Sequence, residues 1–186
     1  MFDAIVLCGG GATRLGGADK AMVEVGGRTL LERALDAVAD AARTIAVGPR
    51  RDIPGAIVWA LEQPPGGGPV AGIDAGLELV REDAVVILGV DHPFVDEACI
   101  SDLLAHFDRD GVILRDATGR HQFLVGVYRT AALTDVLEDV EPDGMSVRDL
   151  VTGLDLVQLD DPRARDADTW DDISAADERL REGDRS

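Results

Sequence analysis

The sequence predicts an α/β fold with a mostly parallel mixed sheet flanked by helices. Short apolar segments alternate with segments of helical periodicity along most of the 186 residues. The run 84–90 is apolar on both faces, as expected of a central strand in a parallel sheet. The apolar segment 4–7 leads directly into a glycine-rich stretch, which is typical of a turn at the carboxyl end of a strand.

Length and composition restrict the class of protein. A chain of 186 residues is expected to form one domain, 1–186. Its net charge of −18 argues against nucleic-acid binding, which depends on Lys and Arg. No apolar run reaches the roughly 18 residues that span a bilayer, and Met1 to Asp3 lack the basic start of a secretory signal. We therefore expect a cytoplasmic protein with no membrane partner.

The first half of the chain reads as strands joined by loops and one well-marked helix. After strand 4–7 and the glycine-rich stretch, the short extended segment 21–25 turns at two glycines. Thr29 and Glu32 have the spacing of a capping box, so a helix is predicted to follow with apolar positions over 30–38. Further strands are predicted at 44–47 and 57–59.

The second half departs from strict alternation. The Pro- and Gly-rich loop 62–72 leads into a helix, and the strand 84–90 into a second helix that Asp96 is placed to cap. The adjacent strands 111–114 and 122–128, joined by a turn at 116–120, predict one antiparallel element. The remaining predictions are a helix capped by Thr130, a short helix from Ser146, a strand at 154–159 and a last helix at 175–181 capped by Ser174 with Asp177.

The stretch from Leu7 to Lys20 has the composition of a phosphate-binding loop. Five glycines within nine residues expose backbone N–H groups, and Arg14 and Lys20 add positive charge. A P-loop is excluded because no lysine follows Gly16 at the required spacing. The dinucleotide fingerprint is disfavoured because Arg14 stands where its third glycine belongs.

Asp91 is the candidate metal ligand. It follows the most strand-like run in the chain, and Pro93 fixes the path of the chain after it. A carboxylate in this place is aimed into the cleft at the carboxyl end of a sheet. The three histidines, His92, His106 and His121, do not have the spacing of a ligand set, and neither do the two cysteines.

The strand followed by Leu-x-Gly-Gly, then Arg14, then Gly-Gly-x-Asp-Lys resembles the signature that opens the molybdenum cofactor guanylyltransferases. Later segments match in order, at 68–72, 91–94, 122–129, 145–148 and 172–174. The resemblance implies a three-layer Rossmann-like nucleotidyltransferase fold. It also implies an Mg²⁺-dependent enzyme that transfers GMP from GTP to the terminal phosphate of molybdopterin or molybdenum cofactor, with release of pyrophosphate. Molybdoenzymes or cofactor-delivery proteins would be further partners.

The resemblance also assigns roles to individual residues. The implied catalytic residues are Arg14 and Lys20, which pair with the phosphate oxygens, and Asp91, which is the implied Mg²⁺ ligand. The implied nucleotide-binding residues are Leu7, Cys8, Gly9, Gly10, Gly11, Lys20, Gly48, Glu62, Gln63, Gly68 and Asp91. Asp172 and Ser174 occupy positions where relatives place polar residues near the second substrate or the metal.

Several positions depart from the family pattern. Cys8 replaces an alanine, Gly48 an asparagine that contacts the nucleoside, and Ser174 an Asn or Asp. Relatives carry an aspartate that contacts the guanosine near Glu62 and Gln63, and either residue could take its place. The alternatives are a cytidylyltransferase for molybdenum cofactor, a sugar-phosphate nucleotidyltransferase, or an accessory protein that binds nucleotide without turnover.

Overall fold

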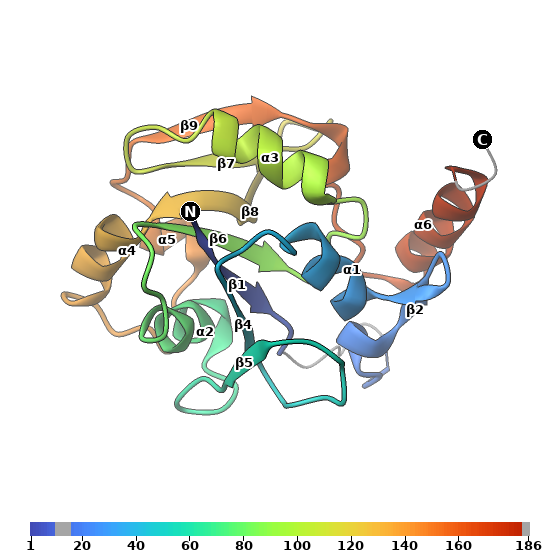
Figure 1. Cartoon of the computed structure of the whole chain (residues 1–186), viewed down its shortest axis with the longest axis horizontal. Helices are drawn as coiled ribbons and strands as arrows, with labels where there is room; N and C mark the ends of the chain where they lie inside the picture. Colours follow the sequence, from blue (N-terminus) through green and yellow to red (C-terminus); the bar gives the residue numbers. More distant parts are fainter. Residues whose placement is uncertain (10–15, 184–186) are drawn as a thin grey trace.

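The computed structural model describes residues 1–9 and 16–183, which form a seven-stranded sheet with helices on both faces (Figure 1). The sheet has the strand order β5-β4-β1-β6-β8-β7-β9, and β2 and β3 form a separate ribbon. The strands are β1 (Asp3–Leu7), β2 (Glu24–Val25), β3 (Arg28–Thr29), β4 (Arg43–Val47), β5 (Ile57–Ala60), β6 (Ala84–Gly89), β7 (Gly111–Arg115), β8 (His121–Arg129) and β9 (Leu156–Asp160). The helices are η2 (Lys20–Met22), α1 (Leu30–Ala37), α2 (Gly68–Leu77), α3 (Glu97–Ala105), α4 (Thr130–Leu137), α5 (Val147–Leu150), η3 (Pro162–Ala164) and α6 (Trp170–Gly183).

The mixed sheet has a single antiparallel strand among the described residues. β8 runs antiparallel to both of its neighbours, β6 and β7. The other pairs of the large sheet, β1 with β4, β1 with β6, β4 with β5 and β7 with β9, are parallel. This confirms the predicted antiparallel element and the central place of the run 84–90.

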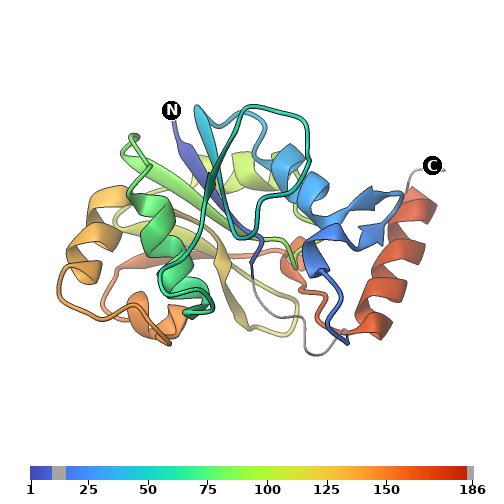
Figure 2. The same cartoon turned by 90° about the horizontal axis from the view of Figure 1, so that it is seen from below.

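Alternate residues of the strands face opposite helical layers, as the period of two requires. Ile5, Ile45 and Ile87 belong to a core that also contains residues of α2, α4 and α5. Val6 and Val86 belong to a second core with residues of α1 and α3. Figures 1 and 2 show these two groups of helices on opposite sides of the sheet. The fold is therefore the three-layer α/β arrangement that the resemblance implied.

The predicted helix caps at Thr29 and Asp96 are confirmed, and the one at Thr130 is wrong. Thr29 Oγ1 accepts a hydrogen bond from Glu32 N at 3.1 Å, and Thr29 N donates to Glu32 Oε2 at 2.8 Å, which completes the capping box of α1. Asp96 Oδ1 accepts from Cys99 N at 2.8 Å and caps α3. Thr130 is the first residue of α4, and its hydroxyl instead donates to Glu82 O at 2.7 Å. Its side chain therefore ties α4 to the segment before β6.

The last helix begins earlier than predicted. α6 starts at Trp170, and Asp172 Oδ2 accepts hydrogen bonds from Thr169 N at 3.1 Å and Thr169 Oγ1 at 2.6 Å. The middle of α6 packs on the ribbon of β2 and β3, where Gly26 N donates to Asp177 Oδ1 at 2.8 Å (Figure 2). Ser174 therefore lies inside the helix and does not cap it. No helix within residues 1–9 and 16–183 is long and apolar enough to cross a membrane.

Candidate functional site

The carboxyl ends of four parallel strands meet at one edge of the sheet. The register places Leu7 of β1 beside Val47 of β4 and Gly89 of β6, while Val47 also pairs with Ala60 of β5. The segments that follow these strands carry the predicted residues Cys8, Gly9, Gly48, Glu62, Gln63 and Asp91. The sheet therefore brings together most of the residues that the sequence assigned to a nucleotide site.

Gly48 is required by a close approach of two backbones. Its φ is +140°, and a Cβ built on it would lie 2.6 Å from Gly9 N and 2.9 Å from Cys8 C. Cys8 N also donates to Val47 O at 2.9 Å, which holds the two segments together. Gly48 thus forms one wall of the site with its backbone, against Cys8 and Gly9. Burial raises the pKa of Cys8, with Arg51 acting in the opposite direction, so this thiol stays protonated near neutral pH.

Substitution of Gly48 by alanine is expected to lower the free energy of unfolding by about 1–3 kcal/mol, because the new methyl group overlaps Gly9. Gly55→Ala is a matched control. Gly55 has a similar φ of +131°, but the atoms nearest to a Cβ there are side-chain carbons of Ile57 at 3.7 Å. Urea denaturation of both variants separates the overlap from the backbone strain that they share. Equal losses in the two variants would contradict the close-approach explanation.

Asp91 lies two residues beyond β6 and is held from three directions. Its Oδ2 is 3.8 Å from Lys20 Nζ, and its Oδ1 is 2.9 Å from His92 Nδ1. Ala167 N donates to its carbonyl at 2.8 Å. A Cβ on Gly89 would lie 2.5 Å from Asp91 Oδ1, so the glycine leaves room for the carboxylate. The structure therefore fixes both the backbone and the side chain of Asp91.

The surroundings of Asp91 keep its carboxyl group ionised. Burial alone would raise its pKa, but the charges of His92 and Lys20 outweigh burial and hold the pKa well below its usual range. The contact with His92 is an ion pair without hydrogen-bond geometry, so the buried Oδ1 has no hydrogen-bond donor among the described residues. A buried anionic oxygen without a donor is suited to accept a cation or a ligand donor.

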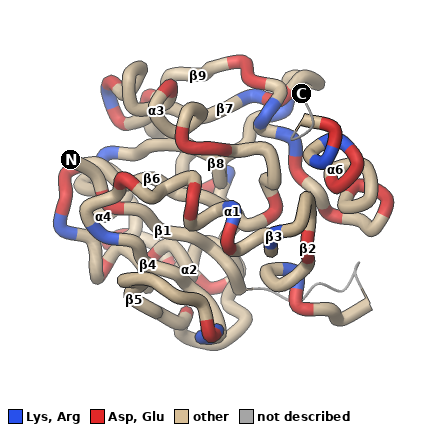
Figure 3. Tube along the Cα trace, turned by 45° about the vertical axis from the view of Figure 1, so that its right-hand side comes forward, with Lys and Arg blue, Asp and Glu red and all other residues tan. Residues whose placement is uncertain are grey.

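Lys20 is the single lysine of the chain, which has a net charge of −18 and acidic residues along most of its elements (Figure 3). Its Nζ lies 2.7 Å from Asp168 Oδ1 and 3.8 Å from Asp91 Oδ2, and its side chain is 18% exposed. The ammonium group thus bridges two carboxylates from segments far apart in the sequence. A polyanionic ligand could contact it in this place.

Sequence reasoning missed Asp168. It lies just before α6, in a segment that also binds Asp91 through Ala167 N. The sequence assigned a second-substrate role to Asp172 and Ser174 instead. Asp172 accepts from Thr169, and the Ser174 hydroxyl donates to Trp170 O at 2.9 Å, so both side chains make contacts at the start of α6. The only available signal was the acidic sequence Asp-Ala-Asp at 166–168, which Thr169 separates from the helix.

Glu62 and Gln63 differ in their surroundings. Glu62 Oε1 accepts a hydrogen bond from Gly66 N at 3.2 Å and lies 3.7 Å from the position of a Cβ on Gly9. Its Oε2 is buried and has no hydrogen-bond partner among the described residues. Gln63 is exposed. Of the two candidates, Glu62 is therefore the one that lies beside the Cys8–Gly9 backbone.

The loop after Glu62 is supported by the connection between α4 and α5, in the same helical layer as α2. Gly67 O accepts a hydrogen bond from Gly144 N at 2.8 Å. Gly68 is the first residue of α2, with a φ of +91° and open space around its Cα. Three of the predicted residues, Gly10, Gly11 and Arg14, lie outside the described residues, so their places in the site stay predictions.

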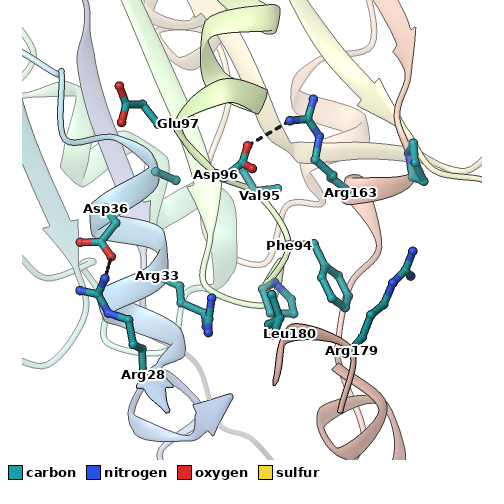
Figure 4. Close-up of a pocket in the computed structure, with 13 residues that line it drawn as sticks. Arg28, Arg33, Asp36, Phe94, Val95, Asp96, Glu97, Arg163, Arg179 and Leu180 are labelled. Carbon is teal, nitrogen blue, oxygen red and sulfur yellow. Dashed lines mark hydrogen bonds and ion pairs between the residues drawn. The ribbon is translucent and has the colours of Figure 1, made fainter. Parts of the chain in front are cut away.

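A separate cavity of about 540 Å³ lies between α1, the start of α3 and α6 (Figure 4). The described residues that line it include none of the predicted site residues. Two of its basic side chains pair with carboxylates, Arg28 with Asp36 and Arg163 with Asp96. The cavity is therefore distinct from the strand-end site that contains Asp91.

The chain is similar in sequence to proteins of one known family. The profile of the MobA-like NTP transferase domain matches residues 4–157. A probable molybdenum cofactor guanylyltransferase from Natronomonas pharaonis is 26% identical over 95% of this chain and 96% of its own length. The molybdenum cofactor guanylyltransferase of Rhodopseudomonas palustris is 38% identical, over 50% of this chain and 49% of that protein.

Solved structures show the same fold at low sequence identity. Molybdopterin-guanine dinucleotide biosynthesis protein A from Archaeoglobus fulgidus superposes with a TM-score of 0.75 and 22% identity, covering 97% of this chain and 99% of that chain. A nucleotidyl transferase from Methanothermobacter thermautotrophicus gives a TM-score of 0.79 with 17% identity, covering 98% and 99%. With the profile spanning most of the sequence, the chain belongs to the family of MobA-like NTP transferases.

Proposed function

We propose that this protein transfers GMP from GTP to the terminal phosphate of molybdopterin or molybdenum cofactor and releases pyrophosphate. The relatives from Natronomonas and Rhodopseudomonas carry the name of this activity. The observation that carries the choice of GTP is the buried oxygen Glu62 Oε2, which has no donor among the described residues. The reaction would take place in the cytoplasm. Cofactor-delivery proteins would supply the pterin, and molybdoenzymes would receive the product.

Glu62 suits guanine better than the other bases. Guanine presents two adjacent N–H donors, N1–H and N2–H, on one edge, and a carboxylate accepts such a pair in a bidentate manner. Cytosine and adenine each offer one amino group on the corresponding edge, so one carboxylate oxygen would stay unpaired. An unpaired buried oxygen costs more than the bond contributes when it is made. Glu62 would therefore select GTP through its position beside Gly9.

Lys20 and Asp91 would act at the phosphate end of the same nucleotide. The reaction forms a bond between an oxygen of the acceptor phosphate and the α-phosphorus, and it breaks the bond from the α-phosphorus to the bridging oxygen of the leaving pyrophosphate. Both reactants are polyanions, so neutralising and aligning them supplies most of the catalysis. Lys20, held between two carboxylates, would pair with phosphate oxygens. The acceptor phosphate is already ionised and needs no general base.

The residues beside Lys20 fit a magnesium ion. Mg²⁺ binds to one or two carboxylates together with substrate phosphates and water. Asp91 and Asp168 both lie within ion-pair distance of Lys20, and Asp91 Oδ1 is buried without a hydrogen-bond donor among the described residues. These two carboxylates would hold the ion, which when bound supplies positive charge to the phosphate oxygens. Lys20 keeps the two acidic groups together before the substrates bind.

The direct test is to supply the purified protein with Mg²⁺, molybdopterin and each nucleoside triphosphate in turn. Pyrophosphate release and the mass of the dinucleotide product report the reaction. We expect product from GTP and pyrophosphate release only when the pterin is present. A preference for CTP would overturn the assignment of the base. Binding of GTP and Mg²⁺ with no pterin-dependent release would support the accessory protein instead.

Glu62→Gln is expected to lower kcat/KM for GTP by roughly 10–100-fold, because a charged hydrogen bond contributes about 1.5–3 kcal/mol. The loss of kcat/KM for CTP should be smaller, so the ratio of kcat/KM for GTP to that for CTP falls. Glu178→Gln makes the same chemical change at an exposed position of α6 and should alter neither value. Equal losses for GTP and CTP in Glu62→Gln would show that Glu62 does not read the base.

A further inference from the structure

Arg51, in the loop after β4, uses its whole guanidinium group in contacts around the site. Its Nη2 donates to Cys8 O at 3.0 Å and to Asp19 Oδ1 at 2.7 Å, and its Nε donates to Asp19 Oδ2 at 2.8 Å. Its Nη1 donates to Cys8 Sγ at 3.3 Å and to Pro49 O at 2.9 Å. Five hydrogen bonds match the five N–H groups of arginine. The side chain is 10% exposed, so the group is largely enclosed and its donors are satisfied.

These contacts join two segments that carry the site. Cys8 precedes the glycine-rich stretch, and its backbone packs against Val47 and Gly48. Asp19 comes directly before Lys20, and its carbonyl accepts from Met22 N at 3.0 Å, which forms the turn of η2. A bidentate arginine–carboxylate pair fixes both the position and the plane of the carboxylate. Arg51 therefore fixes the point from which Lys20 projects relative to the backbone at Cys8.

A purely stabilising role explains this arrangement less well. Asp19 is 48% exposed, so solvent screens its ion pair with Arg51 and limits what the pair contributes to stability. Arg51 nevertheless reaches both the Cys8 backbone and the residue next to Lys20. The main effect of these contacts is therefore to fix the position of Lys20. A displacement of about 1 Å in a reacting group can lower a reaction rate about 10²-fold.

We propose that Arg51 is a positioning residue, which holds Lys20 against Asp91 and Asp168 by fixing Asp19 to the Cys8 backbone. The role of Lys20 in GMP transfer rests on the proposed function. The position of Lys20 does not, because its contacts with Asp91 and Asp168 are properties of the folded chain. Loss of Arg51 would release Asp19, and Lys20 would then leave the two carboxylates part of the time.

The single lysine allows a test that needs no enzymatic activity. Acetic anhydride modifies exposed amines, and mass spectrometry of the peptide containing Lys20 gives the rate at the one lysine of the chain. We expect Arg51→Met and Asp19→Asn each to raise this rate about tenfold at temperatures where circular dichroism shows the variants folded. Arg50→Met removes the adjacent exposed arginine and should leave the rate unchanged. Arg51→Lys keeps the charge without the planar fork and should behave like Arg51→Met.

The double variant and the kinetics complete the test. Arg51→Met with Asp19→Asn should label no faster than either single variant, because both remove the same link. In the GMP transfer assay each single variant should lower kcat roughly 10–100-fold, with a smaller change in KM. Unchanged labelling in Asp19→Asn, or additive effects in the double variant, would overturn the proposal. If no variant or parent transfers GMP but the labelling behaves as described, the proposed function fails and the positioning role stands.

Discussion

Replacement of Lys20 by methionine is expected to lower the rate of GMP transfer by roughly 10²–10³-fold, the usual cost of removing one fixed group that stabilises transition-state charge. Lys20 Nζ lies between Asp91 and Asp168 at the strand-end site, and the chain contains no other lysine. Methionine keeps the length and apolar stem of the side chain but removes its charge. The measurement is kcat and KM for GTP at saturating pterin and Mg²⁺.

Two further variants show whether the loss belongs to the site. Arg109→Met removes a cation from an exposed ion pair with Asp155, just before the amino end of β7 and at the opposite edge of the sheet from Asp91, and it should leave the kinetics unchanged. Lys20→Arg keeps the charge in a wider, planar group and should recover part of the rate at most. Wild-type turnover of Lys20→Met, with its fold verified by circular dichroism, would show that Lys20 does not contact the reacting phosphates.

The layers of the fold could be predicted from the sequence because local patterns and tertiary contacts agree. The run 84–90 is apolar on both faces, and β6 lies between β1 and β8 with helices on either side. The capping box at Thr29 and Glu32 is complete within four residues, so no distant contact is needed to form it. The turn at 116–120 likewise specifies the hairpin that makes β8 antiparallel.

The start of α6 could not be predicted in this way because two equivalent caps follow each other. Thr169 with Asp172 and Ser174 with Asp177 have the same spacing. In the structure Asp177 accepts from Gly26 N, 151 residues away, while Asp172 accepts from Thr169. The packing of α6 on the β2–β3 ribbon therefore determines which cap forms. The sequence around the two caps contains no sign of this packing.

The candidate site shows the same division. Asp91 was predictable because it follows a buried strand, but its neighbour Asp168 is brought to it by chain folding across many residues. Gly48 was interpreted as a substituted nucleoside contact. The structure gives it a further role, since its missing side chain admits the backbone of Gly9. The pairs Asp91 with Asp168 and Gly48 with Gly9 depend on long-range contacts, which the spacing of residues in the sequence does not reveal.

Asp91→Asn is expected to lower GMP transfer by roughly 10²–10³-fold and to raise the Mg²⁺ concentration needed for half-maximal rate. Asparagine has nearly the same shape, so the backbone contact from Ala167 N should persist. The change removes the negative charge that lies 3.8 Å from Lys20 Nζ and 2.9 Å from His92 Nδ1. Because nearby charges hold the pKa of Asp91 well below its usual range, the wild-type carboxylate stays ionised and this loss should be the same from pH 6 to pH 8.

Binding of Mn²⁺, followed by electron paramagnetic resonance in the presence of a non-hydrolysable GTP analogue, separates metal binding from other effects of the substitution. Asp91→Asn should weaken Mn²⁺ binding, whereas Asp155→Asn, which removes a carboxylate from an exposed ion pair with Arg109, should not. If Asp91→Asn lost activity but bound Mn²⁺ as tightly as the parent protein, Asp91 would act by orienting Lys20 rather than by holding the metal. Chelation of all divalent ions should abolish transfer in the parent protein, because the two positive charges of Arg14 and Lys20 do not neutralise a triphosphate.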